Sequence, residues 1–132
     1  MLLGLFFGTA LLAANPSPCA GADPAIVGVT VASTTQQGSL NVYHLSGTVK
    51  NLGNRKQASN VLQFVDIFID GQKADTRSIP PLAPGQPQPF FYDFKRSSDA
   101  AARSTRFRFQ LDPSPRGAQD CNPNNDTFLL RV

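Results

Sequence analysis

Apolar and polar residues alternate in short runs along most of the chain, and this pattern predicts an all-β protein. Successive side chains of a strand point to opposite faces, so a period of two indicates a strand with one buried face. Runs of this kind recur at the spacing typical of a β-sandwich. We expect seven strands, over residues 25–33, 41–50, 61–70, 72–79, 88–95, 105–112 and 126–132.

The same alternation predicts which side chains form the core. The expected inward residues are Val27, Val29 and Val31 in the first strand, Tyr43, Leu45, Gly47 and Val49 in the second, Val65, Ile67 and Ile69 in the third, Phe90, Tyr92 and Phe94 in the fifth, Phe107, Phe109 and Leu111 in the sixth, and Phe128, Leu130 and Val132 in the last. Asp70 and Gly71 predict a tight turn. Leu82, inside the Pro-rich segment 80–85, is expected to reach the core.

Composition excludes the main alternative, a helical bundle. The chain of 132 residues has no Glu but contains ten Gly and eleven Pro, whereas helical bundles use Glu heavily and tolerate neither Gly nor Pro inside their helices. With 41% hydrophobic and 16% charged residues it is not disordered either. The net charge of +3 raises the question of an acidic partner.

The N-terminal segment is typical of an export signal. Residues 2–13 form an uncharged apolar run, too short to span a bilayer comfortably and long enough for the hydrophobic part of a signal peptide. We predict a signal peptide over 1–14, a Pro-rich lead-in over 15–24 and one domain over 25–132. Cleavage after Ala22 is an alternative, as is a membrane anchor or a buried strand. The expected location is secreted or periplasmic, with no membrane span in the mature chain.

Two cysteines fit an exported protein. An even number of cysteines in such a chain indicates a disulfide, here between Cys19 and Cys121. Closing a loop of roughly 100 residues stabilises a fold by about 4 to 5 kcal/mol in the chain-entropy treatment. Cleavage after Ala22 would remove Cys19 and leave Cys121 as an unpaired thiol.

A set of weak motifs occurs in a fixed order over residues 23–132. They are G-x-V-x-N-x-G within 47–54, the apolar strand ending in Asp-Gly at 65–71, Ile79 with Leu82 and Gly85, the alternating Phe90, Tyr92 and Phe94, then Leu111-Asp112 and Asn124-Asn125. This order resembles the CARDB modules, the bacterial cell-adhesion-related domains. The resemblance implies a seven-stranded immunoglobulin-like β-sandwich, an extracellular location and an adhesive or accessory binding role without catalytic residues. The family's acidic stretch is replaced here by DCNPNN at 120–125.

Residues for catalysis or for a cofactor are scarce. The single histidine, His44, is expected on the outer face of its strand beside Ser46, while a hydrolytic triad needs a base oriented by an acid and facing a nucleophile. We therefore expect no enzyme. One Met, one His and two cysteines provide no ligand set for heme or copper, and we expect no cofactor.

Metal and nucleic acid are weak alternatives. Asp120, Asn122, Asn124 and Asp126 fall at every second residue, as in the start of a calcium loop. Pro123 interrupts that loop and the twelfth position is Arg131 instead of a bidentate Glu, so we expect a capped turn and no metal. Nucleic acid is not expected, because the arginines are dispersed among core phenylalanines instead of forming a stacking platform.

One sheet face is the expected binding site. In an immunoglobulin-like sandwich the third, sixth and seventh strands share a sheet, so their outward residues should be neighbours. These residues are Phe64, Asp66 and Phe68, then Arg106, Arg108 and Gln110, then Leu129 and Arg131. Exposed Phe and Arg are enriched at interfaces. The alternative is a self-compensating surface, in which Asp66 pairs with Arg106 or Arg108 and Arg stacks over Phe.

The function expected from these observations is that of a small exported, non-catalytic β-sandwich, an adhesion or protein/glycan-binding module. Its partner would be an unknown protein or glycan at the cell surface. A structural or accessory protein of the cell envelope without a discrete ligand is the main alternative. A secreted inhibitor or enzyme is less favoured, with the segment 80–89 as the best exposed loop for an inhibitor.

Overall fold

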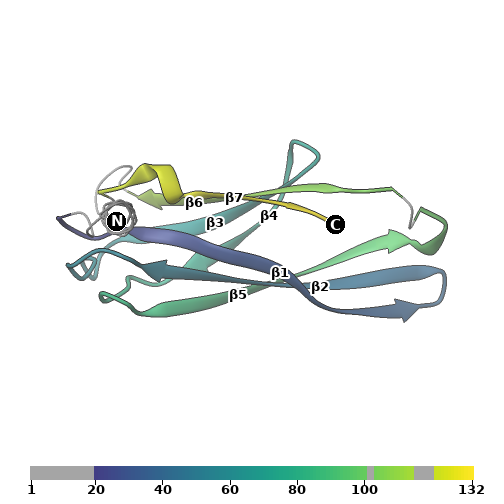
Figure 1. Ribbon diagram of the computed structural model, residues 1–132, viewed down its shortest axis with the longest axis horizontal. Helices are drawn as coiled ribbons and strands as arrows, with labels where there is room; N and C mark the ends of the chain where they lie inside the picture. Colours follow the sequence, from purple (N-terminus) through teal and green to yellow (C-terminus); the bar gives the residue numbers. More distant parts are fainter. Residues whose placement is uncertain (1–19, 101–102, 115–120) are drawn as a thin grey trace, which may run out of the picture.

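Seven strands in two antiparallel sheets make up the fold, as the sequence predicts. A computed structural model gives the structure, which describes residues 20–100, 103–114 and 121–132 (Figure 1). The strands are β1 (Pro24–Gln37), β2 (Leu40–Asn51), β3 (Leu62–Ile69), β4 (Gln72–Ile79), β5 (Pro87–Ser97), β6 (Arg106–Ser114) and β7 (Thr127–Arg131), with short 3-10 turns η1 (Ser98–Ala100) and η2 (Pro123–Asn125). The predicted signal peptide, residues 1–14, lies outside the described ranges.

The two sheets face each other as layers (Figure 1). One sheet has the strand order β1-β2-β5 and the other has the order β4-β3-β6-β7. The third, sixth and seventh strands therefore share a sheet, as predicted. Within the described ranges no helix is long and apolar enough to cross a membrane.

The core lies between the sheets and contains most of the residues that alternation predicts. Val65, Ile67, Phe107, Phe109 and Leu111 from one sheet face Leu45, Val49 and Phe90 from the other, and all are buried. The rings of Phe107 and Phe109 stack with centroids 5.8 Å apart, and Phe94 meets Phe107 edge-on at 5.1 Å. Leu82 is fully buried, as expected. The partly buried Phe128, Leu130 and Val132 pack against this core.

The prediction for the first strand is wrong at Val27 and at Val31, which is 39% exposed. Ile26 pairs with Val49 and Gly28 with Thr48, so Val27 is the extra residue of a β-bulge. A bulge shifts the alternation by one position. Ile26 and Val29 are consequently the buried residues, and Val27 is 46% exposed.

The side chain of Asn51 holds together several backbone segments at one end of the sandwich. Its side chain is completely buried, and its Oδ1 accepts hydrogen bonds from the backbone N–H groups of Asp23 and Gly53, both at 2.9 Å. Its Nδ2 donates to the carbonyl oxygens of Arg55 at 2.8 Å and Leu82 at 2.9 Å. Four hydrogen bonds use the full capacity of an amide side chain.

Two glycines of the same motif are explained by close approach. A Cβ at Gly53 would overlap the carbonyl oxygen of Gly21, because the chain that enters β1 runs directly over this turn. A Cβ at Gly47 would overlap the ring of Phe90 on the neighbouring strand β5. The motif G-x-V-x-N-x-G is therefore a packing requirement of this fold.

We expect the Asn51→Ala variant to lose at least about 3 kcal/mol of unfolding free energy, because the buried N–H groups of Asp23 and Gly53 lose their acceptor at about 1 to 3 kcal/mol each. Urea denaturation measures the loss. The matched control is Asn54→Ala, which removes one exposed hydrogen bond, to the N–H of Gly21 at 2.9 Å, and should cost less than about 1 kcal/mol. Equal losses in the two variants would contradict the role of Asn51.

Candidate functional site

The residues predicted to form a binding face do lie together on the outside of the four-stranded sheet. Along β3 and β6, Phe68 is the ladder partner of Arg108, and Asp66 is the partner of Gln110. Along β6 and β7, Arg108 is opposite Leu129, and Arg106 is opposite Arg131. We call this surface the β3–β6–β7 face; it consists of Phe64, Asp66, Phe68, Arg106, Arg108, Gln110, Leu129 and Arg131.

A cation–π contact fixes the centre of the β3–β6–β7 face. The guanidinium carbon of Arg108 lies 3.9 Å from the centroid of the Phe68 ring, and Nη1 donates to Oε1 of Gln110 at 3.3 Å. Stacking of Arg over Phe was part of the self-compensating alternative, and it is present. Because it draws Arg108 toward β3, the ladder partner of Arg108 on β7 is left uncovered, and Leu129 is 71% exposed.

Asp66 does not pair with either arginine of β6. Its Oδ1 accepts a hydrogen bond from the Thr76 hydroxyl at 2.8 Å and lies 3.3 Å from the Lys73 ammonium. Both partners come from β4, on the other side of β3. The pairing of Asp66 with Arg106 or Arg108, which the self-compensating alternative expected, is therefore wrong. The Asp66 carboxylate does not neutralise the arginines of β6.

Arg106 and Arg131 form a like-charged pair across the ladder of β6 and β7. Nη1 of Arg131 donates to the Ser104 hydroxyl at 3.2 Å, and the backbone N–H of Arg106 donates to Oδ1 of Asp70 at 3.1 Å. In the described part of the chain neither guanidinium forms an ion pair. A pocket of about 300 Å³ lies between them, lined by Arg106, Phe107, Leu129, Leu130 and Arg131.

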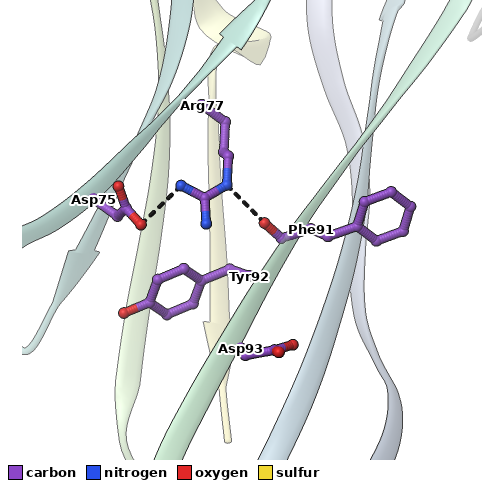
Figure 2. Close-up of a pocket in the computed structure, with 5 residues that line it drawn as sticks. All are labelled: Asp75, Arg77, Phe91, Tyr92 and Asp93. Atoms are coloured by element: carbon purple, nitrogen blue, oxygen red, sulfur yellow. Dashed lines mark hydrogen bonds and ion pairs between the residues drawn. The ribbon is translucent and has the colours of Figure 1, made fainter.

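A second pocket lies on the side of the sandwich where the edge strands β4 and β5 approach each other. It has a volume of about 330 Å³ and is lined by Asp75, Arg77, Phe91, Tyr92 and Asp93 (Figure 2). Arg77 bridges the sheets: Nε donates to the carbonyl oxygen of Phe91 at 2.9 Å, and Nη1 lies 2.7 Å from Oδ2 of Asp75. Figure 2 shows the Phe91 ring pointing away from this guanidinium, and the ring is 61% exposed.

The sequence did not predict this bridge. Arg77 and Phe91 belong to different sheets. Arg77 occupies an inward position at the edge of its sheet, opposite the buried Val65, and nothing in its short polar strand indicated a partner on β5. Most donors of the Arg77 guanidinium are used within the chain, since Nη1 also donates to the Thr76 carbonyl oxygen at 3.0 Å. The arrangement is therefore suited to joining the two sheets.

His44 lies on the outer face of the three-stranded sheet, as expected, and it is oriented by an acid. Its Nδ1 is 2.8 Å from Oδ1 of Asp93, and its Nε2 is 3.1 Å from the Thr35 hydroxyl. Acyl transfer also needs N–H donors aimed at the developing oxyanion. Because β2 is the central strand of its sheet, the N–H groups beside His44 are used in the ladders, and this network orients an imidazole on a flat surface.

Three of the four calcium candidates, Asn122, Asn124 and Asp126, fall in the part of the chain that the structure describes. Asp120 lies outside the described residues. Oδ1 of Asn122 accepts the N–H of Asn124 at 3.3 Å, and Asp126 is buried. Among the described residues there is no group of three or more His, Cys, Asp or Glu side chains placed to hold a metal ion.

Cys121 lies against the segment that leads into β1. Its N–H donates to the carbonyl oxygen of Ala22 at 2.8 Å, and a Cβ at Gly21 would lie 3.6 Å from the Cβ of Cys121. The described ranges contain no free cysteine. Cys19 lies outside them, so its pairing with Cys121 stays a prediction. Gly21, which lies against Cys121, follows Cys19 by two residues in the sequence.

Comparison with known proteins supports the fold that the motifs suggested. No protein-family model and no curated protein matches the chain. Among solved structures, the CARDB domain of a Pyrococcus furiosus protein, crystallised in complex with di-metal ions, is similar with a TM-score of 0.63 and 16% identity, over 89% of this chain and 92% of that one. The solution structure of that domain gives 0.61 and 18% identity, over 86% and 95%.

A third similar structure is a domain from Methanosarcina acetivorans, described as part of a cell surface protein. The TM-score is 0.59 and the identity 22%, over 84% of this chain and 90% of that domain. The chain therefore has a CARDB-like fold, as the order of its motifs predicted.

The Asp75–Arg77 contact predicts a pH effect. The hydrogen bond from the Thr76 N–H and then that from Arg77 hold the pKa of Asp75 below its ordinary value of 3.8. A lowered pKa in the folded state contributes stability above the ordinary pKa, and this contribution is lost as the pH falls through the folded pKa. In the Arg77→Met variant we expect the pKa of Asp75 to rise without reaching 3.8, because the Thr76 N–H remains.

Carboxyl ¹³C NMR titration measures this change. The free energy of unfolding of Arg77→Met should also fall less steeply than that of the unsubstituted chain as the pH drops below 3.8. Asp75→Asn, which removes the carboxylate itself, is the control for the assignment. An Asp75 titration that is unchanged in Arg77→Met would show that Arg77 does not stabilise the carboxylate.

Proposed function

We propose that this chain is an exported, non-catalytic β-sandwich that binds a protein or glycan partner at the cell surface through the β3–β6–β7 face. The observation that carries the proposal is the combination of Arg106, Arg108 and Arg131 with the exposed Leu129. None of these three arginines is ion-paired within the described ranges. Arginines without an ion pair in the described chain, next to an exposed apolar side chain, offer both a charged and an apolar contact to a partner.

The composition of the face supports binding. Arg and aromatic residues dominate the energetics of protein interfaces, and their contribution depends on a rigid, preformed arrangement. Phe68 and Arg108 hold each other in place, since their contact is short and lies at the centre of the face. A surface location is supported by the similarity to a domain of a cell surface protein.

Substitution of both central residues tests the choice of face. In the double variant Phe68→Ala with Arg108→Ala we expect retention on the surface fraction of the native host to weaken by more than about tenfold, because each anchor of this type contributes 1 kcal/mol or more. The control is Phe91→Ala with Lys50→Ala, which removes an exposed aromatic residue and a cation from the opposite sheet and should bind normally.

Circular dichroism and thermal unfolding establish that both double variants are folded. If the variant of the β3–β6–β7 face binds as tightly as the unsubstituted chain, the site lies elsewhere. If neither the unsubstituted chain nor its variants are retained, the structural role without a discrete ligand is favoured.

The proposal of export includes cleavage near Ala14 and a Cys19–Cys121 disulfide. The position of Cys121 against Gly21 and Ala22 supports this pairing, because two residues of chain span the remaining distance easily. A bridge there would tie the entry of β1 to the segment before β7.

Intact mass spectrometry of the exported product tests cleavage and disulfide together. We expect a chain that begins near Asn15, takes up no alkylating reagent before reduction and takes up two equivalents after it. A product that begins at Asp23 would lack Cys19 and would be alkylated at Cys121 without reductant, which would refute both parts of this proposal.

A further inference from the structure

We infer that the pocket between Arg106 and Arg131 binds a peptide segment in which a carboxylate stands next to an apolar side chain. This inference rests on the proposed function and deepens it, because it names the chemistry of the partner. It is carried by three features of the pocket: two arginines that are ladder partners, the space beside them and one exposed leucine.

No carboxylate of the described chain forms an ion pair with these two guanidinium groups. Arg106 and Arg131 are direct ladder partners, and like charges directly opposite each other destabilise a sheet. The carboxylate of Asp70 accepts a hydrogen bond from the backbone N–H of Arg106, and this bond does not involve the guanidinium group. Planar guanidinium forks bind a carboxylate through paired hydrogen bonds, so a carboxylate between the two would offset their repulsion.

Two residues that line the pocket belong to the core side of their strands. Phe107 and Leu130 also line the pocket and are ladder partners, and the side chain of Phe107 points into the core, where it is buried. On the open side Arg108 is drawn away toward Phe68. About 300 Å³ is thereby left beside the two arginines, a volume at the lower end of the range for ligand pockets and suited to one or two side chains.

Leu129 favours a peptide over an acidic polysaccharide. It lines the pocket and is 71% exposed, so a ligand gains free energy by covering it with apolar surface. The acidic sugar units of a polysaccharide carry hydroxyl groups next to their carboxylates, whereas an acidic peptide offers an aliphatic side chain at the neighbouring position. The pocket therefore fits a carboxylate and an apolar group together.

Titration of the ¹⁵N- and ¹³C-labelled chain by NMR tests this inference. The probes are a short synthetic peptide in which aspartate and leucine alternate, the same peptide with asparagine in place of aspartate, and polygalacturonate. We expect the acidic peptide to shift the side-chain Nε–Hε signals of Arg106 and Arg131 and the methyl signals of Leu129. Its affinity should fall about tenfold in Arg106→Gln and in Arg131→Gln, since each removes a hydrogen bond to a charged group.

Matched controls separate a specific site from general charge attraction. Arg55→Gln removes the same charge from an exposed position at the other end of the sandwich and should leave the affinity for the acidic peptide unchanged. Leu129→Ser should lower the affinity for the peptides and leave that for polygalacturonate unchanged. The asparagine peptide should not shift the arginine signals.

Three results would overturn the inference. One is an equal loss of affinity in Arg55→Gln, which would mean non-specific attraction. Another is tighter binding of polygalacturonate than of the acidic peptide in the same pocket, which would make the partner a glycan and leave the proposed function intact. The third is the absence of any shift in the pocket with every probe; the proposed function would then still be judged by the Phe68 and Arg108 variants.

Discussion

The buried side chain of Asn51 is the interaction on which the rest of this structure depends. Four backbone segments meet at it: the entry to β1 at Asp23, the turn at Gly53, the carbonyl of Arg55 and the segment at Leu82. The Leu82 carbonyl oxygen also accepts the N–H of Gln57 at 3.0 Å. The N–H groups of Asp23 and Gly53 are bonded to the Asn51 side chain, and an unpaired backbone group in the core costs about 1 to 3 kcal/mol. One amide side chain thus replaces the missing secondary structure where the strands of both sheets end, and it explains why glycine is needed beside it.

At the other end of the sandwich, the side chain of Arg96 joins chain segments that no sheet ladder connects. Arg96 donates from Nη1 to the Thr105 hydroxyl at 2.9 Å and the Val132 carbonyl oxygen at 2.8 Å, and from Nη2 to the Tyr43 hydroxyl at 2.9 Å. It joins β5 in one sheet to the start of β6 and the end of β7 in the other. Thr105 and Val132 also exchange backbone hydrogen bonds at 2.7 and 2.9 Å. Thr105 and Val132 are the sequence neighbours of Arg106 and Arg131, so these hydrogen bonds hold the end of the ladder in which the two arginines are partners.

Alternation in the sequence was sufficient for the strands, the core and the face that gathers Phe68, Arg108 and Leu129, because a period of two fixes which side chains share a side. It was insufficient in two situations. A bulge such as that at Val27 inserts a residue without any change of composition, so the phase is lost locally. Contacts between strands far apart in the chain, such as that of Arg77 with Phe91 or of His44 with Asp93 across 49 residues, depend on strand order and on the rotamers of long side chains. Asp66 illustrates the same limit, since both of its partners come from the strand that alternation left as a polar edge.

The arginines of this chain differ in whether the fold places a hydrogen-bond acceptor or an aromatic ring beside the guanidinium group. Arg77 and Arg96 reach carbonyl oxygens across the two sheets, and Arg108 covers an aromatic ring; in these places a planar fork does what a lysine could not, because it bonds in several directions at once. Arg106 and Arg131 have the same fork and lie on strands that are just as well ordered, yet the described chain gives them no carboxylate. Exposed ion pairs add little to stability, so their absence costs the fold little. Arg106 and Arg131 are nonetheless like charges opposite each other in one ladder, an unfavourable arrangement that a bound anion would relieve.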